Sequence, residues 1–164
     1  MRLYLLSSLN TDKESALILW DLYVFMRYQG KYRPNFPRKY KGDASNVVYR
    51  SSWEYKFMKW CDYTPSIQEW GSEEIIIPYI SPVDGKRHRY FPDFYVKIQN
   101  RKYLVEVKPL KQTREPKTQK RITKRYVNEV VTWSVNQAKW KAATEFCKDN
   151  NWEFKLITEK ELKV

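Results

Sequence analysis

A Pro-Asp dipeptide ending at Asp93 is followed by the acidic–x–lysine triplet Glu106-Val107-Lys108. The triplet lies in an apolar strand pattern, where residues two apart share a face. Glu106 and Lys108 therefore point the same way, Val107 points into the core, and a hairpin can bring Asp93 beside them. Two carboxylates can hold Mg²⁺, and a nearby lysine can orient or deprotonate water or stabilise charge on phosphorus. The pattern indicates phosphodiester hydrolysis.

An acidic–x–lysine triplet alone is a weak signal, because the chain contains six of them. Only the triplets at Glu106 and Glu153 lie in apolar strand patterns, and only the first follows a Pro-Asp pair, which occurs once. The plainer interpretation is that Glu106 and Lys108 line the polar face of a half-exposed strand. Both interpretations stay open at this point.

The helix expected nearest these residues covers residues 51–62. Four apolar residues recur there at helical spacing and make one face. Ser51 and Glu54 form an S-x-x-E capping box at its start. Glu54 therefore has a structural interpretation, as the residue that closes the cap.

Three strands are expected after this helix. The β-branched run in residues 73–79 predicts a buried strand. Residues 87–98, rich in aromatics, predict a second strand, with Asp84-Gly85 as the hairpin turn before it. Residues 102–108 predict the third strand, which carries the acidic–x–lysine triplet.

The C-terminal part is expected to contain one helix and one strand. Residues 109–125 form a basic, polar connection. Residues 134–148 predict a helix with an apolar stripe, opened by a capping box of Ser134 and Gln137. Residues 152–158 predict the last strand. The element order is helix, three strands, helix, strand.

The charge balance predicts a polyanionic partner. The 164 residues include 31 Lys and Arg against 19 Asp and Glu, a net charge of +12. Such a field attracts DNA, RNA or an anionic membrane surface, and a merely basic soluble protein is the plainer alternative. One histidine argues against enzymes that use histidine clusters, and two cysteines without metal-site spacing indicate reduced thiols in a cytoplasmic protein. No apolar stretch approaches the roughly 20 residues that span a bilayer.

The N-terminal region differs from the rest. Residues 1–29 contain a short helical pattern that ends before Gly30. We interpret them as a helical extension, with Met26 as a candidate for the biological start. Residues 31–41 carry two prolines and many basic residues, which predicts an extended basic arm at the start of a single domain over residues 30–164.

Three segments together resemble a known family. They are residues 49–54 (YRSSWE), 90–94 (YFPDF) and 103–109 (YLVEVKP). Their arrangement resembles the PD-(D/E)xK nuclease superfamily, most closely the head-completion nucleases of T4-type tailed phages and more distantly the transposon-end-cleaving nucleases. The resemblance implies an α/β, restriction-endonuclease-like αβββαβ core, with a mixed central sheet flanked by helices. It also implies Mg²⁺-dependent cleavage, with Mn²⁺ as a substitute, that leaves a 5′-phosphate and a 3′-hydroxyl.

The resemblance also assigns roles to residues. It implies a catalytic set of Glu54, Asp93, Glu106 and Lys108, in which the three carboxylates and the backbone carbonyl of Val107 bind the metal. Two residues on the later helix are auxiliary candidates, and a solvated helix face is the alternative for them: Asn136 and Lys139.

Basic residues on both sides of the proposed site are expected to contact the DNA backbone, although a charge run is often only solvated surface. The expected DNA contacts are Arg33, Arg38, Lys39, Lys41, Lys111, Arg114, Lys117, Lys120, Arg121 and Lys124.

The phage group implies a biological role late in head assembly, in which packaged DNA is trimmed before head–tail joining. That role places the protein in the cytoplasm of an infected cell, in association with the phage head, with portal or neck proteins as candidate partners and no membrane. The first alternative is a non-catalytic, DNA-binding head-completion or neck protein. The second is a transposition or repair nuclease.

Overall fold

The computed structural model describes residues 29–162. The expected extension before residue 29, with Met26, lies outside the described residues. Within the described part, no helix has the length and apolar character needed to cross a membrane.

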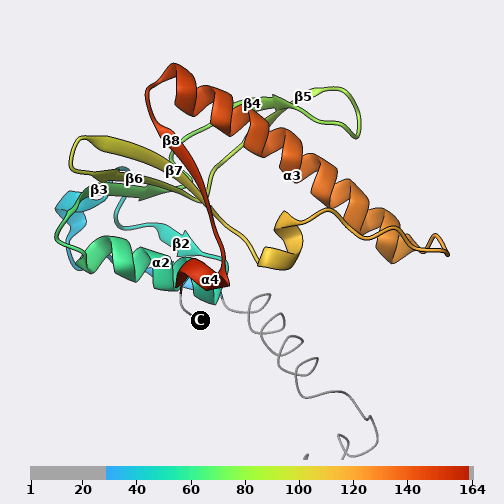
Figure 1. Ribbon diagram of the computed structural model, residues 1–164. Helices are drawn as coiled ribbons and strands as arrows, with labels where there is room; N and C mark the ends of the chain where they lie inside the picture. The colour runs from blue at the N-terminus through green and yellow to red at the C-terminus, as the bar shows by residue number, and fades with distance from the viewer. Residues whose placement is uncertain (1–28, 163–164) are drawn as a thin grey trace, which may run out of the picture.

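A four-stranded mixed sheet forms the centre of the domain (Figure 1). Its strands are β3 (Ile67–Ser72), β6 (Phe94–Ile98), β7 (Arg101–Val107) and β8 (Glu153–Ile157), in the order β3-β6-β7-β8. The first two pairings are antiparallel and the last is parallel. The strand that carries the acidic–x–lysine triplet is therefore an inner strand with a partner on each side.

Two helices cover opposite faces of this sheet (Figure 1). Helix α2 (Ser52–Tyr63) packs with Val105 and Val107 of β7 in one apolar cluster. Helix α3 (Lys124–Asp149) packs with Leu104 in a second cluster. The alternation along β7 thus separates the two cores, as a strand with both faces covered requires. The order α2, β3, β6, β7, α3, β8 confirms the expected αβββαβ core.

Smaller elements surround the core. A two-stranded sheet precedes α2, and a second one, the β4–β5 hairpin, is inserted between β3 and β6. Gly85 has a φ of +67° in the turn of this hairpin, which confirms the turn expected at Asp84-Gly85. The remaining elements are β1 (Gly30–Tyr32), η1 (Pro37–Lys39), β2 (Val47–Tyr49), β4 (Ile77–Ile80), β5 (Arg87–Tyr90), η2 (Leu110–Thr113) and α4 (Glu159–Leu162).

The expected strand over residues 73–79 is right only for residues 77–79, which lie in β4, and wrong for residues 73–76. The first core strand is the earlier β3, in which Ile67 and Trp70 are fully buried. Glu73 follows it with a φ of 56°, a conformation that leaves the extended region and ends the strand. Pairing resumes only at Ile77, in the separate β4–β5 hairpin, and Ile76 is 50% exposed.

The expected strand over residues 87–98 is two strands. β5 ends at Tyr90 and β6 begins at Phe94. Pro92 lies between them, and a proline has no N–H to donate to a ladder. The break frees the segment that carries Asp93 from strand pairing.

Helix α3 begins ten residues before its expected start at residue 134. Thr123 is its N-cap, and the Thr123 hydroxyl accepts a hydrogen bond from the N–H of Tyr126 at 3.2 Å. The capping box expected at Ser134 is therefore wrong, because Ser134 lies inside the helix. No proline or glycine between residues 124 and 133 interrupts the helix.

Residues 31–41 do not form an extended arm. Tyr32 and Tyr40 are buried in the core cluster on the α2 side, and the Tyr40 and Trp70 rings meet edge-to-face at 4.8 Å. Lys39 donates to the backbone carbonyls of Asp62 and Thr64 at 2.9 and 2.8 Å, at the C-terminal end of α2. The aromatic residues between the charges tie this segment to the fold.

Candidate active site

Glu106 and Lys108 lie together on the face of β7 expected from their spacing. The Lys108 Nζ atom lies 3.0 Å from Glu106 Oε1, and Glu106 is only 4% exposed. The other oxygen of Glu106, Oε2, accepts a hydrogen bond from the Tyr90 hydroxyl at 2.7 Å. Val107 between them is 1% exposed, on the opposite face. The half-exposed-strand interpretation is therefore wrong for Glu106.

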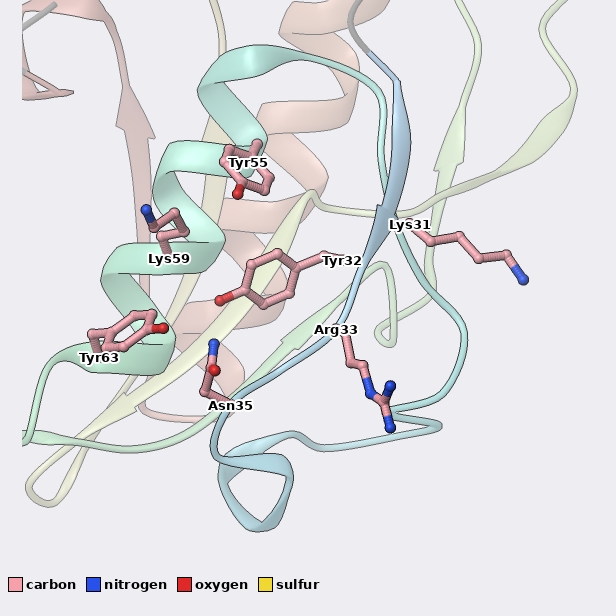
Figure 2. A pocket seen from close by; sticks show the side chains of 7 residues that line it. All are labelled: Lys31, Tyr32, Arg33, Asn35, Tyr55, Lys59 and Tyr63. Atoms are coloured by element: carbon pink, nitrogen blue, oxygen red, sulfur yellow. The ribbon is translucent and has the colours of Figure 1, made fainter.

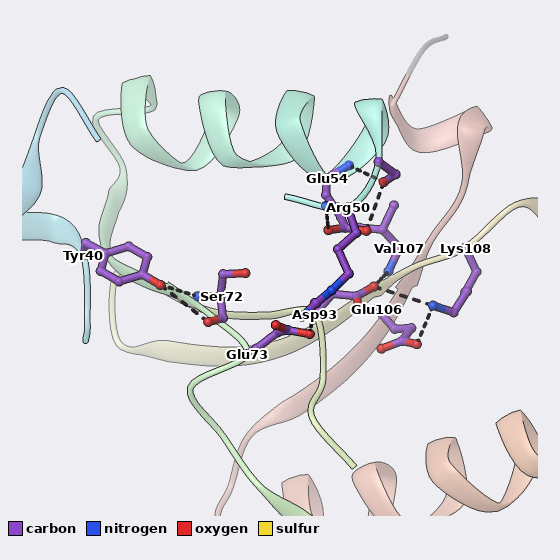
Figure 3. Close-up of polar contacts among 10 residues, drawn as sticks. Tyr40, Arg50, Glu54, Ser72, Glu73, Asp93, Glu106, Val107 and Lys108 are labelled. Atoms are coloured by element: carbon purple, nitrogen blue, oxygen red, sulfur yellow. Dashed lines mark hydrogen bonds and ion pairs between the residues drawn. The ribbon is translucent and has the colours of Figure 1, made fainter. Parts of the chain in front are cut away.

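Asp93 approaches this pair from the segment before β6. Its Oδ2 atom accepts a hydrogen bond from the Val107 N–H at 2.8 Å and lies 4.0 Å from Lys108 Nζ (Figure 3). Burial, and then the charge of Glu106, raise the pKa of Asp93 to about 8, against the opposing effect of Lys108. Asp93, Glu106 and Lys108 thus form one cluster of interacting charges.

Lys108 carries its positive charge in this group. Burial lowers the pKa of a lysine, but the carboxylates of Asp93 and Glu106 outweigh that effect and raise the pKa of Lys108. An ammonium between two carboxylates is suited to stabilising negative charge on a bound phosphate. Proton abstraction by Lys108 would first require the loss of that proton.

Glu54 is engaged at the start of α2. Its carboxylate accepts hydrogen bonds from the Arg50 N–H at 2.8 Å and the Ser51 hydroxyl at 3.0 Å. The Ser51 hydroxyl in turn accepts from the Glu54 N–H at 3.1 Å. This confirms a reciprocal cap, although the carboxylate reaches the N–H of Arg50 rather than that of Ser51.

The expected metal site with three carboxylates is not assembled. No group of three or more His, Cys, Asp or Glu side chains within residues 29–162 is placed to hold a metal ion together. The Glu54 carboxylate is instead engaged by the Arg50 N–H and the Ser51 hydroxyl. The charge of Glu54 still acts on both Asp93 and Lys108, so it lies in the electrostatic neighbourhood of the site.

The strand-borne carboxylates nevertheless suit a hard divalent cation. Asp93 and Glu106 offer only oxygen atoms, the ligands that Mg²⁺ prefers. Burial first and the charge of Glu106 second raise the pKa of Asp93, so added positive charge would favour its ionised form. The Val107 N–H bonds Asp93 from the residue directly after Glu106.

Arg50 and Glu73 are additional residues of the site that the sequence did not single out. The Arg50 guanidinium forms an ion pair with the Glu73 carboxylate, and Figure 3 shows it reaching from the start of α2 past Asp93. The charges of Glu54 and Asp93 contribute to raising the pKa of Arg50, after the larger effect of Glu73. Arg50 directly precedes the capping box, but nothing in the sequence links it to Glu73.

The structure brings α3 to the site through Tyr90. Lys139 Nζ lies 5.6 Å from the centre of the Tyr90 ring and 5.8 Å from that of Tyr79. Asn136, one turn earlier, is 7% exposed, so the solvated-face alternative is wrong for it. Lys139 is half-buried and reaches the residue that holds Glu106.

The basic residues proposed to contact DNA fall into two groups. One group is exposed along the connection from β7 to α3, directly after Lys108: Lys111, Arg114, Lys117, Lys120, Arg121 and Lys124. The other group lies near the far end of α2, where Arg33, Arg38 and Lys41 are exposed and Lys39 is turned onto the protein. The first group is contiguous with the site, whereas the second is not.

A pocket of about 230 Å³ lies beside the second group (Figure 2). Tyr55, Lys59 and Tyr63 line it from α2. Its other lining residues are Lys31, Tyr32, Arg33 and Asn35. None of the four expected catalytic residues lines it, so this hollow is separate from the carboxylates.

Comparison with known proteins shows the family. The model of the TnsA-like endonuclease N-terminal family matches residues 64–159. The chain belongs to this PD-(D/E)xK nuclease family. The matched range contains Asp93, Glu106 and Lys108, whereas Glu54 precedes it.

A similar relative extends the family assignment. The chain is 41% identical over 144 residues to the head completion nuclease of Enterobacteria phage T4, across 85% of this chain and 96% of the relative. No solved structure matches. The expected superfamily and phage group are confirmed.

Proposed function

We propose that this protein is a Mg²⁺-dependent DNA endonuclease that hydrolyses phosphodiester bonds. The observation that carries the proposal is the cluster of Asp93, Glu106 and Lys108, in which two carboxylates, one of them buried, meet a charged lysine beside the end of β7. The family match and the T4 relative support hydrolysis of DNA. We further propose that the protein trims packaged DNA in phage head completion, before head–tail joining.

Asp93, Glu106 and the backbone carbonyl of Val107 are the proposed ligands for Mg²⁺, with Mn²⁺ as a substitute. When bound, the cation polarises the phosphoryl oxygen and lowers the pKa of water. The Val107 N–H fixes Asp93, and the Tyr90 hydroxyl fixes Glu106. These contacts orient the carboxylates before a ligand arrives.

Lys108 is proposed to stabilise the charge that develops on the scissile phosphate. Its ammonium is already charged, and its carboxylate partners hold it in place. Asn136 and Lys139 are proposed to support the site from α3. The exposed residues from Lys111 to Lys124 would hold the DNA backbone beside it.

Glu54 is proposed to exchange its cap for a role at the metal. Loss of an N-cap costs about 1 kcal/mol, which is small beside the attraction between a carboxylate and a divalent cation. The electrostatic influence of Glu54 on Asp93 supports this exchange. The Glu54 side chain would then cap α2 in one state and bind the metal in another.

The test is cleavage of supercoiled plasmid with Mg²⁺, Mn²⁺ or EDTA. Wild type is expected to nick with either metal, and Asp93→Ala and Lys108→Ala to lose nicking while retaining folding and DNA binding. Lys155→Ala is the matched control, because Lys155 belongs to the second acidic–x–lysine triplet in a strand and pairs with Glu153 at 2.9 Å. Undiminished activity of Lys108→Ala would refute the assigned site.

Two other functions have an observation in their favour. A non-catalytic DNA-binding head or neck protein is favoured because no three acidic, His or Cys side chains in residues 29–162 are placed to hold a metal ion together. It predicts salt-sensitive DNA binding without cleavage in any metal. A transposition nuclease is favoured by the TnsA-like match, and it predicts cleavage that requires a partner recombinase.

A further inference from the structure

One face of the β4–β5 hairpin combines positive charge with apolar surface. In the antiparallel register, Arg87 lies opposite Ile80 and Arg89 lies opposite Pro78. Paired residues of antiparallel strands project to the same side, so these four side chains share a face. All four are exposed. The hairpin therefore presents two arginines, two residues apart, outside the central sheet.

The other face of the hairpin anchors it to the domain. Ile77, Tyr79 and Tyr90 are buried in the cluster that contains residues of α3. Lys139 of α3 lies near both tyrosine rings. The face of the β4–β5 hairpin that carries the arginines is thus exposed, whereas the opposite face packs against the domain.

Exposed and buried residues follow one another in the short connection from β5 to Asp93. Tyr90 is 3% exposed and Pro92 is fully buried, whereas Phe91 is 38% exposed and the Asp93 side chain 18%. Arg87 and Arg89 share one face of β5, and Phe91 is exposed directly after the strand. An aromatic ring stands open two residues before a proposed metal ligand.

The exposed ring of Phe91 lies beside the guanidinium of Arg89. The guanidinium carbon of Arg89 lies 5.9 Å from the centre of the Phe91 ring. Extended chain advances about 3.3 Å per residue, so the three steps of β5 from Arg87 to Tyr90 span about 10 Å. A DNA strand advances 3.4 Å per nucleotide, so this span matches roughly three nucleotides.

We propose that Arg87, Arg89 and Phe91 form a track for one DNA strand, in which Phe91 stacks on an unpaired base next to the phosphate at Asp93. The proposal rests on DNA being the substrate of the site. Arginines bind phosphate oxygens, and an aromatic ring stacks on the face of any base. Inside a duplex that face is covered by neighbouring base pairs, so the ring favours an unpaired nucleotide. The substrate class is therefore DNA with a frayed end, a flap or a gap.

A polyanion fits this face better than a protein partner does. Lys86, Arg87 and Arg89 precede the exposed ring along the chain, with Arg89 beside it, and the one acid of the turn, Asp84, is engaged by His88 at 2.9 Å. An apolar protein surface would leave these cations without partners. The track also ends at carboxylates, where a cleavable phosphate would be positioned.

The test is DNA binding in EDTA, so that no cleavage is needed. Wild type is expected to bind a duplex with a short unpaired overhang more tightly than the blunt duplex. Phe91→Ala should weaken binding of the overhang DNA by roughly 5- to 150-fold, the range for loss of one stacked base, and leave blunt-duplex binding nearly unchanged. Phe91→Trp should restore the preference. Tyr63→Ala is the control, since Tyr63 is also an exposed aromatic residue (54%) but lies at the C-terminal end of α2.

A second measurement reports stacking itself. 2-Aminopurine at the unpaired position should lose fluorescence on binding to wild type and retain it with Phe91→Ala. Equal affinity of wild type for blunt and overhang DNA, or equal loss for both in Phe91→Ala, would overturn the proposal. If plasmid nicking fails in every metal while the Phe91-dependent preference persists, the nuclease assignment falls and the track stands.

Discussion

The strand-borne and helix-borne acids of the site are held in opposite ways. Asp93 and Glu106 are crowded together in a buried place, where burial and like charge disfavour ionisation of Asp93. Glu54 is satisfied by the N–H of Arg50 and the hydroxyl of Ser51. The difference teaches that a bound cation would stabilise Asp93 and Glu106 directly, whereas Glu54 must first give up existing hydrogen bonds.

Removal of a strand-borne acid should have the largest effect. Glu106→Ala is expected to lower the rate of plasmid nicking at least about 100-fold, because it removes a proposed metal ligand and the partner of Lys108. Glu153→Ala is the matched control, since Glu153 also precedes a lysine by two residues but is exposed in β8. Equal losses in the two variants would remove the distinction between the triplets.

The closeness of Asp93 to Glu106 predicts that replacing Asp93 with a neutral residue raises the free energy of unfolding in a pH-dependent way. The pKa of Asp93 is about 8 in the folded state, against about 4 in an unfolded chain. Ionisation between these values favours unfolding, so wild type should lose stability as pH rises through this window. Asp93→Asn removes that loss and should be more stable by about 1–2 kcal/mol at pH 8, with a smaller difference at pH 5.

Urea unfolding in EDTA, at pH 5 and at pH 8, measures the difference in stability between Asp93→Asn and wild type. Asp43→Asn is its control, because hydrogen bonds from Ser45 lower the pKa of the exposed Asp43. If Asp93→Asn raises the free energy of unfolding more at pH 5 than at pH 8, the raised pKa of Asp93 is contradicted.

Two variants at the start of α2 separate the cap from the proposed metal role of Glu54. Ser51→Ala and Glu54→Ala should each lower the free energy of unfolding by about 1 kcal/mol, because each breaks the reciprocal cap. Only Glu54→Ala should also weaken the stabilisation by Mg²⁺, measured as the rise in Tm with added metal. If Ser51→Ala weakens it equally, Glu54 acts only as a cap.

The smallest effect is expected at the hydroxyl that fixes Glu106. Tyr90→Phe removes one hydrogen bond, worth about 0.5–1.5 kcal/mol, and should slow nicking by roughly 2- to 10-fold. Tyr95→Phe is the control, because Tyr95 donates to Glu69 at 3.1 Å from the neighbouring strand. Nicking rates of single-turnover reactions compare the two, and equal slowing would argue against a positioning role for Tyr90.

The sequence predicted the strand-borne group because its information is local. Alternation around Glu106 and Lys108 is read directly from spacing, and Pro92 marks the segment that carries Asp93. The capping box of Ser51 and Glu54 is equally local and was confirmed. Spacing does not reveal that the Glu54 carboxylate also bonds the backbone N–H of Arg50.

Features that depend on long-range packing were missed. β3 has few β-branched residues and is defined by its pairing with β6 and the burial of Trp70. The Arg50–Glu73 ion pair and the Tyr90–Glu106 hydrogen bond join residues 23 and 16 positions apart. Tyr32 and Tyr40 hold a segment whose basic residues suggested a free arm. In each case tertiary contacts decide what local composition leaves open.

The parallel pairing of β7 with β8 has a consequence for how the protein is made. Glu106 lies opposite Leu156 in this register, and the N–H of Lys108 donates to the Ile157 carbonyl at 3.0 Å. β8 leaves the ribosome only after all of α3 has been synthesised. Until then the strand that carries the active residues lacks one neighbour. Nascent chains should therefore lack nuclease activity until synthesis has passed β8.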